Sequence, residues 1–264
     1  MPDASTPRAY FRRLGDQRFE ATAHVGGAWA TTEQHVSPAL GLLAHAIEVD
    51  RDTRRDDQLP LARLSYDIFG AIPIDVVDLE VEVVRPGRTI ELVEARLSYA
   101  GRVALALRAW LMRPYETSEF AATTLARIEP PDRMAPWDPS TFWPGGFVGS
   151  VEVRRAEQEP GRATFWLRTS VALIDGEPVS DLARAVGLFD LANGMTPRVP
   201  SSRLAFPNVD LTARLFEPQR GEWLGFDTAV TFGEHGIGLT FSIIHDLHGP
   251  IGTIAQCLTI RPRD

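Results

Sequence analysis

The feature that most constrains the fold of this chain is an internal repeat with a nearly constant spacing. The segment 64–69 matches the segment 211–216, the segment 84–87 matches 230–233, and the turn glycine Gly101 matches Gly249. The offset stays between 146 and 148 residues, which indicates a duplication better than any single identity would. A chain of 264 residues has room for two copies of ordinary domain size.

A proline-rich segment separates the two copies. It contains Pro130, Pro131, Pro136, Pro139 and Pro144 and shows little regular alternation, which is typical of a linker or an ordered surface loop. We therefore expect an N-terminal repeat at 1–114, a connecting segment at 115–146 and a C-terminal repeat at 147–264.

Each copy shows the same order of elements. In the first, Ser37 and Pro38 predict the start of a helix over 37–49, whose apolar stripe is formed by Leu40, Leu43, Ala44 and Ile47. In the second, Ser180 predicts a helix carrying Leu182, Ala185, Val186 and Phe189 and ending near Asn193 and Gly194. Alternating patterns predict strands at 19–25, 61–69, 76–85, 89–99, 102–112, 148–155, 163–173, 208–216, 223–232, 237–245 and 250–260.

One long helix followed by antiparallel strands indicates a sheet wrapped around a helix, which is the hotdog arrangement. We therefore predict an α+β fold, a tandem (double) hotdog with two long helices, each wrapped by an antiparallel sheet. A single open sheet leaves an edge and an apolar face to cover, so hotdogs pair, and a tandem fusion forms the pair within one chain.

Composition and charge exclude several classes of function. The net charge of −8 argues against a broad nucleic-acid surface, although arginine dominates the basic residues and suits local phosphate contacts. The single cysteine, Cys257, rules out an internal disulfide. No stretch approaches the roughly 20 apolar residues of a membrane helix, so we expect a cytoplasmic protein that does not bind membranes.

The repeat also allows the two copies to be compared position by position. Asp210 falls opposite Arg63, Thr231 opposite Arg85, and Gln256 opposite Arg108. An Asp, a Thr and a Gln can together hold a water, because the carboxylate accepts its proton while the hydroxyl and the amide fix its direction. The alternative is structural: Gln256 and Thr231 would satisfy strand-end backbone groups, and Asp210 would pair with an arginine.

Over residues 19–261 the chain resembles the acyl-CoA thioesterase II (TesB-like) double-hotdog family, especially its actinobacterial members. The matching stretches are Gly27-Ala28-Trp29, Gln34-His35 with Pro38, residues 84–88, residues 206–212, Gly221-Glu222-Trp223, residues 236–239 and residues 249–252 leading to Ala255-Gln256. In that family an Asp, a Thr and a Gln activate the hydrolytic water. Matched by position, the resemblance implies Asp210, Thr231 and Gln256 as the catalytic residues, with Thr228 as the alternative threonine.

The chain departs from the family before its first helix. Family members often carry His-Gly-Gly-Pro, whereas this chain reads His35-Val36-Ser37-Pro38. Two glycines would let backbone N–H groups approach a thioester carbonyl closely, so Val36 and Ser37 put the accepted acyl chain in question. Asp190 and Asn193, near the end of the second helix, could also line the site, although helix capping explains Asn193 equally well.

The predicted function is hydrolysis of an acyl-CoA thioester to free acid and CoA, without a metal or another cofactor. Two other functions remain open: a non-catalytic acyl-binding or acyl-CoA-binding hotdog protein, and an enzyme of the enoyl-CoA hydratase type. The hydratase ranks low because its Asp-x4-His pattern is missing after the loops that lead into the helices. We also expect a homodimer or a higher homo-oligomer, because the fused pair still exposes sheet surface.

Overall fold

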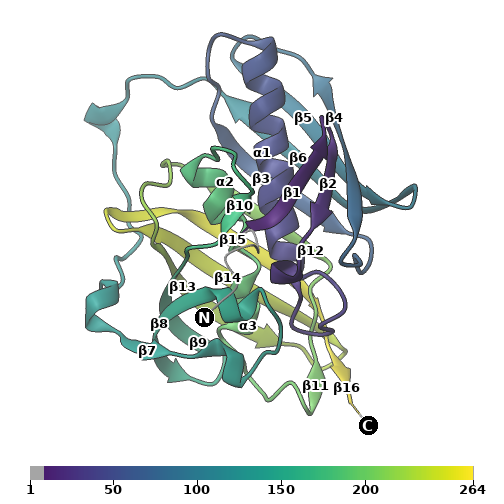
Figure 1. The fold of residues 1–264 in the computed structure, drawn as a ribbon. Coiled ribbons are helices and arrows are strands. Elements are labelled where there is room, and N and C mark those ends of the chain that lie inside the picture. Colours follow the sequence, from purple (N-terminus) through teal and green to yellow (C-terminus); the bar gives the residue numbers. More distant parts are fainter. Residues whose placement is uncertain (1–8, 264) are drawn as a thin grey trace.

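The computed structural model describes residues 9–263 and contains two repeats that share one sheet (Figure 1). The first repeat contains β1 (Ala9–Gly15), β2 (Arg18–Ala21), α1 (Val36–Arg54), β3 (Leu61–Ile68), β4 (Val76–Arg85), β5 (Ile90–Tyr99) and β6 (Arg102–Met112). The connecting segment adds β7 (Ala135–Trp137). The second repeat contains β8 (Val151–Glu159), β9 (Arg162–Thr169), β10 (Ala172–Ile174), α2 (Asp181–Val186), α3 (Leu191–Gly194), β11 (Leu204–Ala205), β12 (Asp210–Leu215), β13 (Leu224–Phe232), β14 (Ile237–Asp246), β15 (Gly249–Thr259) and β16 (Arg261–Pro262).

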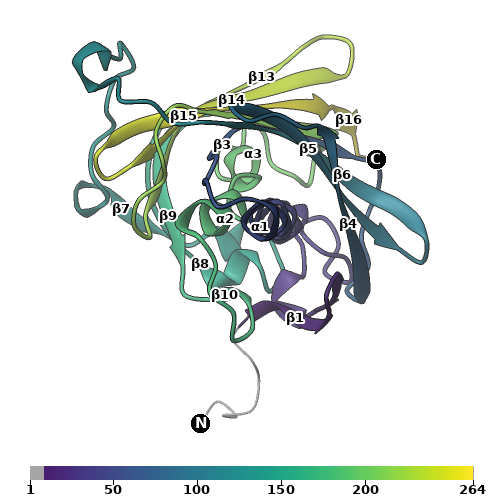
Figure 2. The ribbon, with the colours of Figure 1, turned by 90° about the horizontal axis from the view of Figure 1, so that it is seen from above.

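Within residues 9–263, fourteen strands form one sheet in the order β10-β1-β2-β4-β5-β6-β3-β12-β15-β14-β13-β9-β8-β7. The pairs are antiparallel except β1 with β10, and the two repeats meet at this pair and where β3 pairs with β12. Figure 2 shows the sheet curving around α1, which confirms the predicted α+β hotdog arrangement. None of the helices described is both long and apolar enough to cross a membrane.

The first helix follows its predicted stripe but begins earlier than predicted. The four stripe residues, Leu40, Leu43, Ala44 and Ile47, are fully buried under the sheet. The predicted N-cap, Ser37, is wrong: the cap is His35, whose Nδ1 accepts the backbone N–H of Ser37 at 3.2 Å. A ring nitrogen that is not protonated can accept this hydrogen bond as a side-chain oxygen would, so the cap lies outside the usual residue types.

The second long helix that we predicted is not continuous. It is divided into α2 and α3, and the turn between them contains Gly187 and Asp190. The split coincides with a close crossing of helices, because a Cβ built on Gly41 of α1 would lie 2.9 Å from the Cα of Gly187. After Gly187 the chain continues with tight hydrogen bonds from residue i to i−3, such as Leu188 to Ala185, instead of a regular α-helix.

The register of the sheet places a pseudo-twofold axis between β3 and β12. Ser65 and Thr212 are counterparts in the repeat, and they are also direct cross-strand partners whose hydroxyl oxygens are 3.0 Å apart. A twofold axis exchanges counterparts, so a pair of counterparts that face each other must lie on that axis. The duplication therefore builds, within one chain, the symmetric pairing that two identical subunits would form.

The same register corrects one of the predicted comparisons between repeats. Ser65 pairs with Arg108 and Thr212 pairs with Ala255, so Ala255 is the counterpart of Arg108. Gln256 is therefore the counterpart of Ala109, and its predicted match with Arg108 is wrong by one residue. The error arises at the turns: Gly101 lies inside the β5–β6 turn, whereas Gly249 already forms the first residue of β15.

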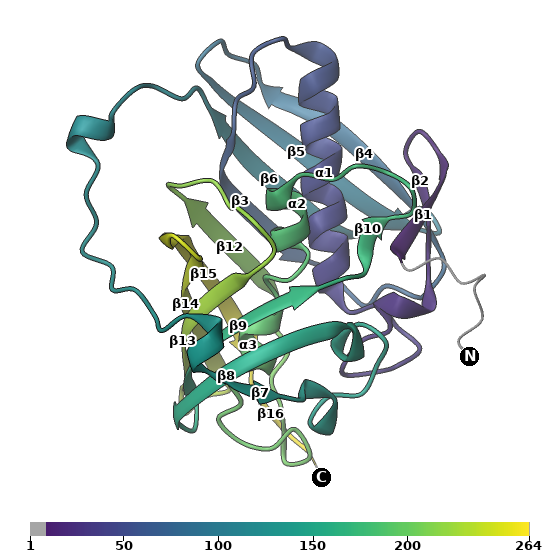
Figure 3. The same cartoon turned by 60° about the vertical axis from the view of Figure 1, so that its left-hand side comes forward.

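The connecting segment lies along the second repeat for part of its length (Figure 3). The Nε2 of His245 lies 3.0 Å from the carbonyl oxygen of Ala126, and the indole N–H of Trp166 donates to the carbonyl of Glu129 at 2.7 Å. Further along, β7 pairs with β8 at the edge of the sheet. Residues 1–8 and residue 264, which the predicted repeats include, lie outside the described part of the chain.

Candidate active site

The structure does not bring the three predicted site residues together. Gln256 is 1% exposed and projects from β15 to the inner face of the sheet, towards the helices. On β12 the buried residues Leu211 and Ala213 occupy that inner face, so alternation along the strand turns Asp210 to the outer face. There the carboxylate of Asp210 accepts the backbone N–H of Cys257 at 2.6 Å.

Neither candidate threonine completes a site with Gln256. Thr231 is exposed near the end of β13, where it pairs with Leu239 of β14. Thr228 is fully buried on the inner face, but its hydroxyl lies 2.8 Å from that of Ser242. We therefore assign the water-holding position to neither of them.

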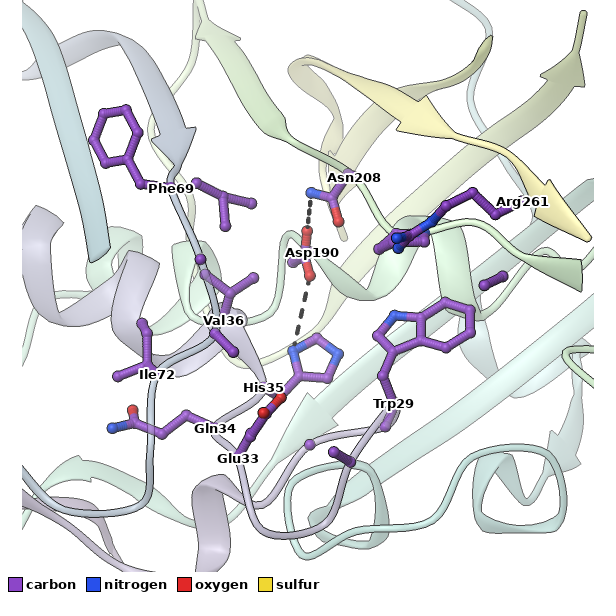
Figure 4. Close-up of a pocket in the computed structure, with 18 of the residues that line it drawn as sticks. Trp29, Glu33, Gln34, His35, Val36, Phe69, Ile72, Asp190, Asn208 and Arg261 are labelled. Atoms are coloured by element: carbon purple, nitrogen blue, oxygen red, sulfur yellow. Dashed lines mark hydrogen bonds and ion pairs between the residues drawn. The ribbon is translucent and has the colours of Figure 1, made fainter. Parts of the chain in front are cut away.

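The amide of Gln256 instead donates to Asp190, in the turn between α2 and α3. Gln256 Nε2 lies 2.8 Å from Asp190 Oδ1, and Asn208 Nδ2 lies 2.7 Å from the same oxygen. Asn208 comes from the segment before β12, so three separated parts of the second repeat converge on one carboxylate. Figure 4 shows Asn208 on one side of Asp190 and His35 on the other.

The first repeat holds Asp190 in place from the other side. The hydroxyl of Ser37 in the first turn of α1 accepts the backbone N–H of Asp190 at 3.2 Å. Ser37 is fully buried, and this contact gives a structural reason for a hydroxyl at this position. His35 Nδ1 lies 3.8 Å from Asp190 Oδ2, the oxygen that the two amides leave free.

Burial changes the proton affinity of Asp190. Its side chain is 8% exposed, and the loss of hydration raises its pKa to about 7, although the hydrogen bonds from Asn208 and Gln256 act in the opposite direction. Near neutral pH this carboxyl group is therefore divided between its acid and base forms. A general base works best when its pKa lies near the working pH, which distinguishes Asp190 from ordinary surface carboxylates.

His35 is held in one neutral form. Burial lowers its pKa to about 4, so the ring is uncharged at neutral pH. Its Nδ1 accepts the N–H of Ser37, so the hydrogen of the neutral ring must reside on Nε2. The ring packs on Phe147 with a centroid distance of 4.7 Å, which fixes its orientation. His35 therefore carries an uncharged N–H donor at Nε2, while its acceptor nitrogen Nδ1 faces Asp190.

Of these residues, His35, Asp190 and Asn208 line a cavity of about 450 Å³ between the two repeats. Its wall on the side of the first repeat is mainly apolar but includes Glu33 and Gln34, and His35 and Asn208 flank Asp190 (Figure 4). The residues that line it are Gly27, Ala28, Trp29, Ala30, Glu33, Gln34, His35, Val36, Ile68, Phe69, Gly70, Ala71, Ile72, Asp190, Ala205, Pro207, Asn208, Arg261 and Arg263. Such a volume suits a small organic group. In the part of the chain that the structure describes, no group of three His, Cys, Asp or Glu residues could hold a metal ion.

The three arginines used for the comparison lie away from this cavity. Arg108 pairs with Glu94 at 2.6 Å, and Arg85 donates to the carbonyl of Ile90 at 2.9 Å. Arg63 faces Arg214 across the β3–β12 junction, and its pKa is lowered by burial and by these neighbouring cations. Their roles in the fold are local contacts on the sheet.

The fold and the geometry of the site define a double hotdog with a carboxylate-centred pocket between its halves. The chain belongs to the acyl-CoA thioesterase family: the family model of the acyl-CoA thioesterase C-terminal domain matches residues 127–260, and that of the N-terminal domain matches residues 25–112. This finding confirms the family resemblance and the predicted enzyme class, an acyl-CoA thioesterase. The comparison with curated proteins finds no match.

Solved structures share the fold over nearly the whole chain. A conserved protein of unknown function with a hot dog fold from Alicyclobacillus acidocaldarius is 14% identical, with a TM-score of 0.75 and 96% of each chain covered. An acyl-CoA thioesterase II from Mycobacterium marinum is 13% identical, with a TM-score of 0.67 and 97% of this chain and 96% of that chain covered. A TesB protein from Mycobacterium avium is 14% identical, with a TM-score of 0.66 and 96% of each chain covered.

Proposed function

We propose that this enzyme hydrolyses acyl-CoA thioesters with Asp190 as the general base, in place of the predicted Asp210. The observation that carries the proposal is the convergence of Gln256 and Asn208 on the Asp190 carboxylate beside a cavity. Of the three residues predicted from the sequence, Gln256 keeps a place in this mechanism. Asn208 occupies the position of the third polar group, for which we had expected a threonine.

The hydrogen bonds from the two amides give the two carboxylate oxygens of Asp190 different roles. Oδ1 accepts both amide N–H groups, so Oδ2 is the oxygen available to a water. Among the described residues the carbonyl oxygen of the Gln256 amide has no hydrogen-bond partner, and it provides an acceptor near the same carboxylate. Fixed acceptors of this kind bind the O–H groups of a water, and this restricts the direction in which its lone pairs point.

In the proposed reaction, Asp190 takes a proton from the water as the water oxygen attacks the thioester carbon. Negative charge then develops on the carbonyl oxygen, and the N–H at Nε2 of His35 donates a hydrogen bond to it. The tetrahedral intermediate collapses by breaking the C–S bond, which releases the acid and the CoA thiolate. The proton held by Asp190 passes to the thiolate, which restores the base.

The pH dependence of the reaction follows from the pKa of Asp190. Only the ionised carboxylate accepts a proton, so kcat/KM should rise with pH and level off above an inflection near pH 7. His35 should add no inflection above pH 5, because its pKa of about 4 keeps it neutral there. Initial rates with an acyl-CoA from pH 5 to pH 9 test this. A rate that is independent of pH over this range would contradict the assignment of the base.

Two substitutions at His35 separate its two roles. His35→Asn keeps an acceptor for the Ser37 N–H, since asparagine is a good N-cap, but its shorter side chain loses the donor at the Nε2 position. His35→Gln places an amide nitrogen near that position but caps the helix poorly. We expect kcat to fall by about 10² to 10³ in His35→Asn, as for loss of an oxyanion donor, with the melting temperature nearly unchanged.

His35→Gln should show the reverse pattern, with a lower melting temperature and a smaller loss of kcat. Thermal unfolding and steady-state kinetics of both variants provide the measurement. If both variants retain the kcat of the wild type, His35 does not contact the reacting oxygen.

We further propose that the protein works as a homodimer or higher homo-oligomer in the cytoplasm, with the division into repeats at 1–114 and 147–264. Support for assembly comes from the outer face of β14, where Ile237, Leu239 and Phe241 alternate and are 65%, 46% and 42% exposed. We expect light scattering at micromolar concentration to give at least twice the mass of 29.2 kDa. A monomer mass under those conditions would refute the assembly.

A further inference from the structure

A cluster of arginines borders the opening of the cavity. Arg261 and Arg263 line the cavity, and Arg261 belongs to β16, the short strand that pairs with β11. The backbone N–H of Arg263 donates to the carbonyl of Arg203 at 3.1 Å, which brings a third arginine to the same small sheet. Figure 4 shows Arg261 on the side of the cavity where Trp29 lies.

Among the residues that the structure describes, these arginines differ from many others because they form no ion pair there. Within residues 9–263 no carboxylate lies within 4.0 Å of Arg203, Arg261 or Arg263, whereas Arg54, for example, contacts both Asp50 and Glu91. The guanidinium of Arg263 lies over the ring of Trp29, 5.3 Å from its centroid, and all three arginines are exposed. Their charge is therefore available to a ligand.

The positive charge of these arginines contrasts with the negative net charge of the protein. The chain has a net charge of −8, so a polyanionic ligand would be repelled by the molecule as a whole unless cations surround its entrance. Arg261 lies in β16, Arg263 follows that strand directly, and both line the same cavity, so their charges act together. Guanidinium groups match phosphate oxygens with two parallel hydrogen bonds, which an ammonium group cannot do.

We propose that Arg261 and Arg263, with Arg203 beside them, bind the phosphate groups of the CoA part of the substrate. This inference rests on the proposed function only in that the acyl end of the same molecule reaches Asp190. The cluster would select a thioester of CoA over one that carries the same acyl group on pantetheine, which has no phosphate. The arginines contribute binding and orientation and take no part in the chemical step.

Free CoA and pantetheine are the probes that test this proposal, because the two share the thiol arm and differ in the phosphates. We expect calorimetry to show that Arg261→Ala and Arg263→Ala each weaken CoA binding by about 10-fold, since each removes a charge-assisted contact. Pantetheine binding should not change. Arg102→Ala, an exposed arginine in the β5–β6 hairpin outside the cavity lining, is the matched control for the lost charge and should leave both affinities unaltered.

Kinetics and salt provide further readouts. With an acyl-CoA the two variants should raise KM with little change in kcat, and with the corresponding acyl-pantetheine they should change neither constant. The loss of CoA affinity should shrink as salt is added, because screening weakens the wild-type contacts. Equal effects on CoA and pantetheine, or an equal effect of Arg102→Ala, would overturn the proposal.

The binding experiments do not depend on hydrolysis. If Asp190 were not the base, a variant at that position would stay active while the arginine variants still lost CoA affinity. If the arginine cluster did not bind phosphate, the variants would bind CoA as the wild type does, whatever the outcome at Asp190. The two proposals therefore fail separately.

Discussion

Asp190→Asn should lower kcat by at least about 100-fold while the protein stays folded. An amide cannot take a proton from water, so the variant loses the base but nearly keeps the volume of the side chain. The variant should remain folded, because an uncharged amide at this buried position avoids the desolvation cost of a charged carboxylate. The same cost raises the pKa of Asp190. Steady-state kinetics, with circular dichroism to verify folding, provide the measurement.

Asp210→Asn is the matched control for this experiment. The carboxylate of Asp210 lies on the outer face of the sheet, where it accepts a backbone N–H, and the amide oxygen of asparagine can accept the same bond. We expect kcat to change by less than about threefold, whereas a catalytic Asp210, as the family resemblance implies, would require a large loss. The reverse result, an inactive Asp210→Asn and an active Asp190→Asn, would return the chemistry to the residue first predicted.

Gly41→Val should destabilise the protein strongly, by about 3 kcal/mol. Replacing a glycine inside a helix would by itself stabilise α1 by some tenths of a kcal/mol. Against this, a Cβ at position 41 would lie 2.7 Å from the carbonyl oxygen of Ala183 and 2.9 Å from the Cα of Gly187. Both atoms belong to backbone that cannot rotate away, so the steric cost is larger than the gain in helix propensity.

Urea denaturation measures this effect, and Gly149→Ala is a suitable control because nothing lies within 4 Å of a Cβ at that position. We expect the free energy of unfolding of the control to lie within about 0.5 kcal/mol of the wild-type value. A Gly41→Val protein as stable as the wild type would contradict the prediction, because it would show that α1 and α2 can move apart without a free-energy cost.

Much of the sheet could be predicted because alternation is a local property of the chain. The strands predicted at 76–85 and 102–112 end at the residues observed for β4 and β6. The break between α2 and α3 could not be predicted in this way. It coincides with the contact of Gly187 with α1, whose residues lie about 146 positions earlier in the chain.

The sequence predicts part of the candidate site, and the differences between prediction and structure have physical causes. Gln256 stood out as a polar residue within an apolar strand, and the structure places it at the cavity carboxylate. The sequence around Asp210 matches the family and favours it over Asp190, yet the alternation of the buried residues Leu211 and Ala213 turns Asp210 outwards. The capping role of His35 left no sequence signal, since it requires a neutral ring nitrogen.

The hydroxyl of Ser37 on the backbone of Asp190 has a consequence for how such enzymes can diverge. The base comes from one half of the chain, while Ser37, which binds its backbone N–H, and His35, which faces its free oxygen, come from the other. A recombinant chain that joins the first half of one relative to the second half of another would contain two folded hotdog repeats. The residues that meet at the site between them would not be complementary. We therefore expect the two halves of this protein to evolve as a single inherited unit.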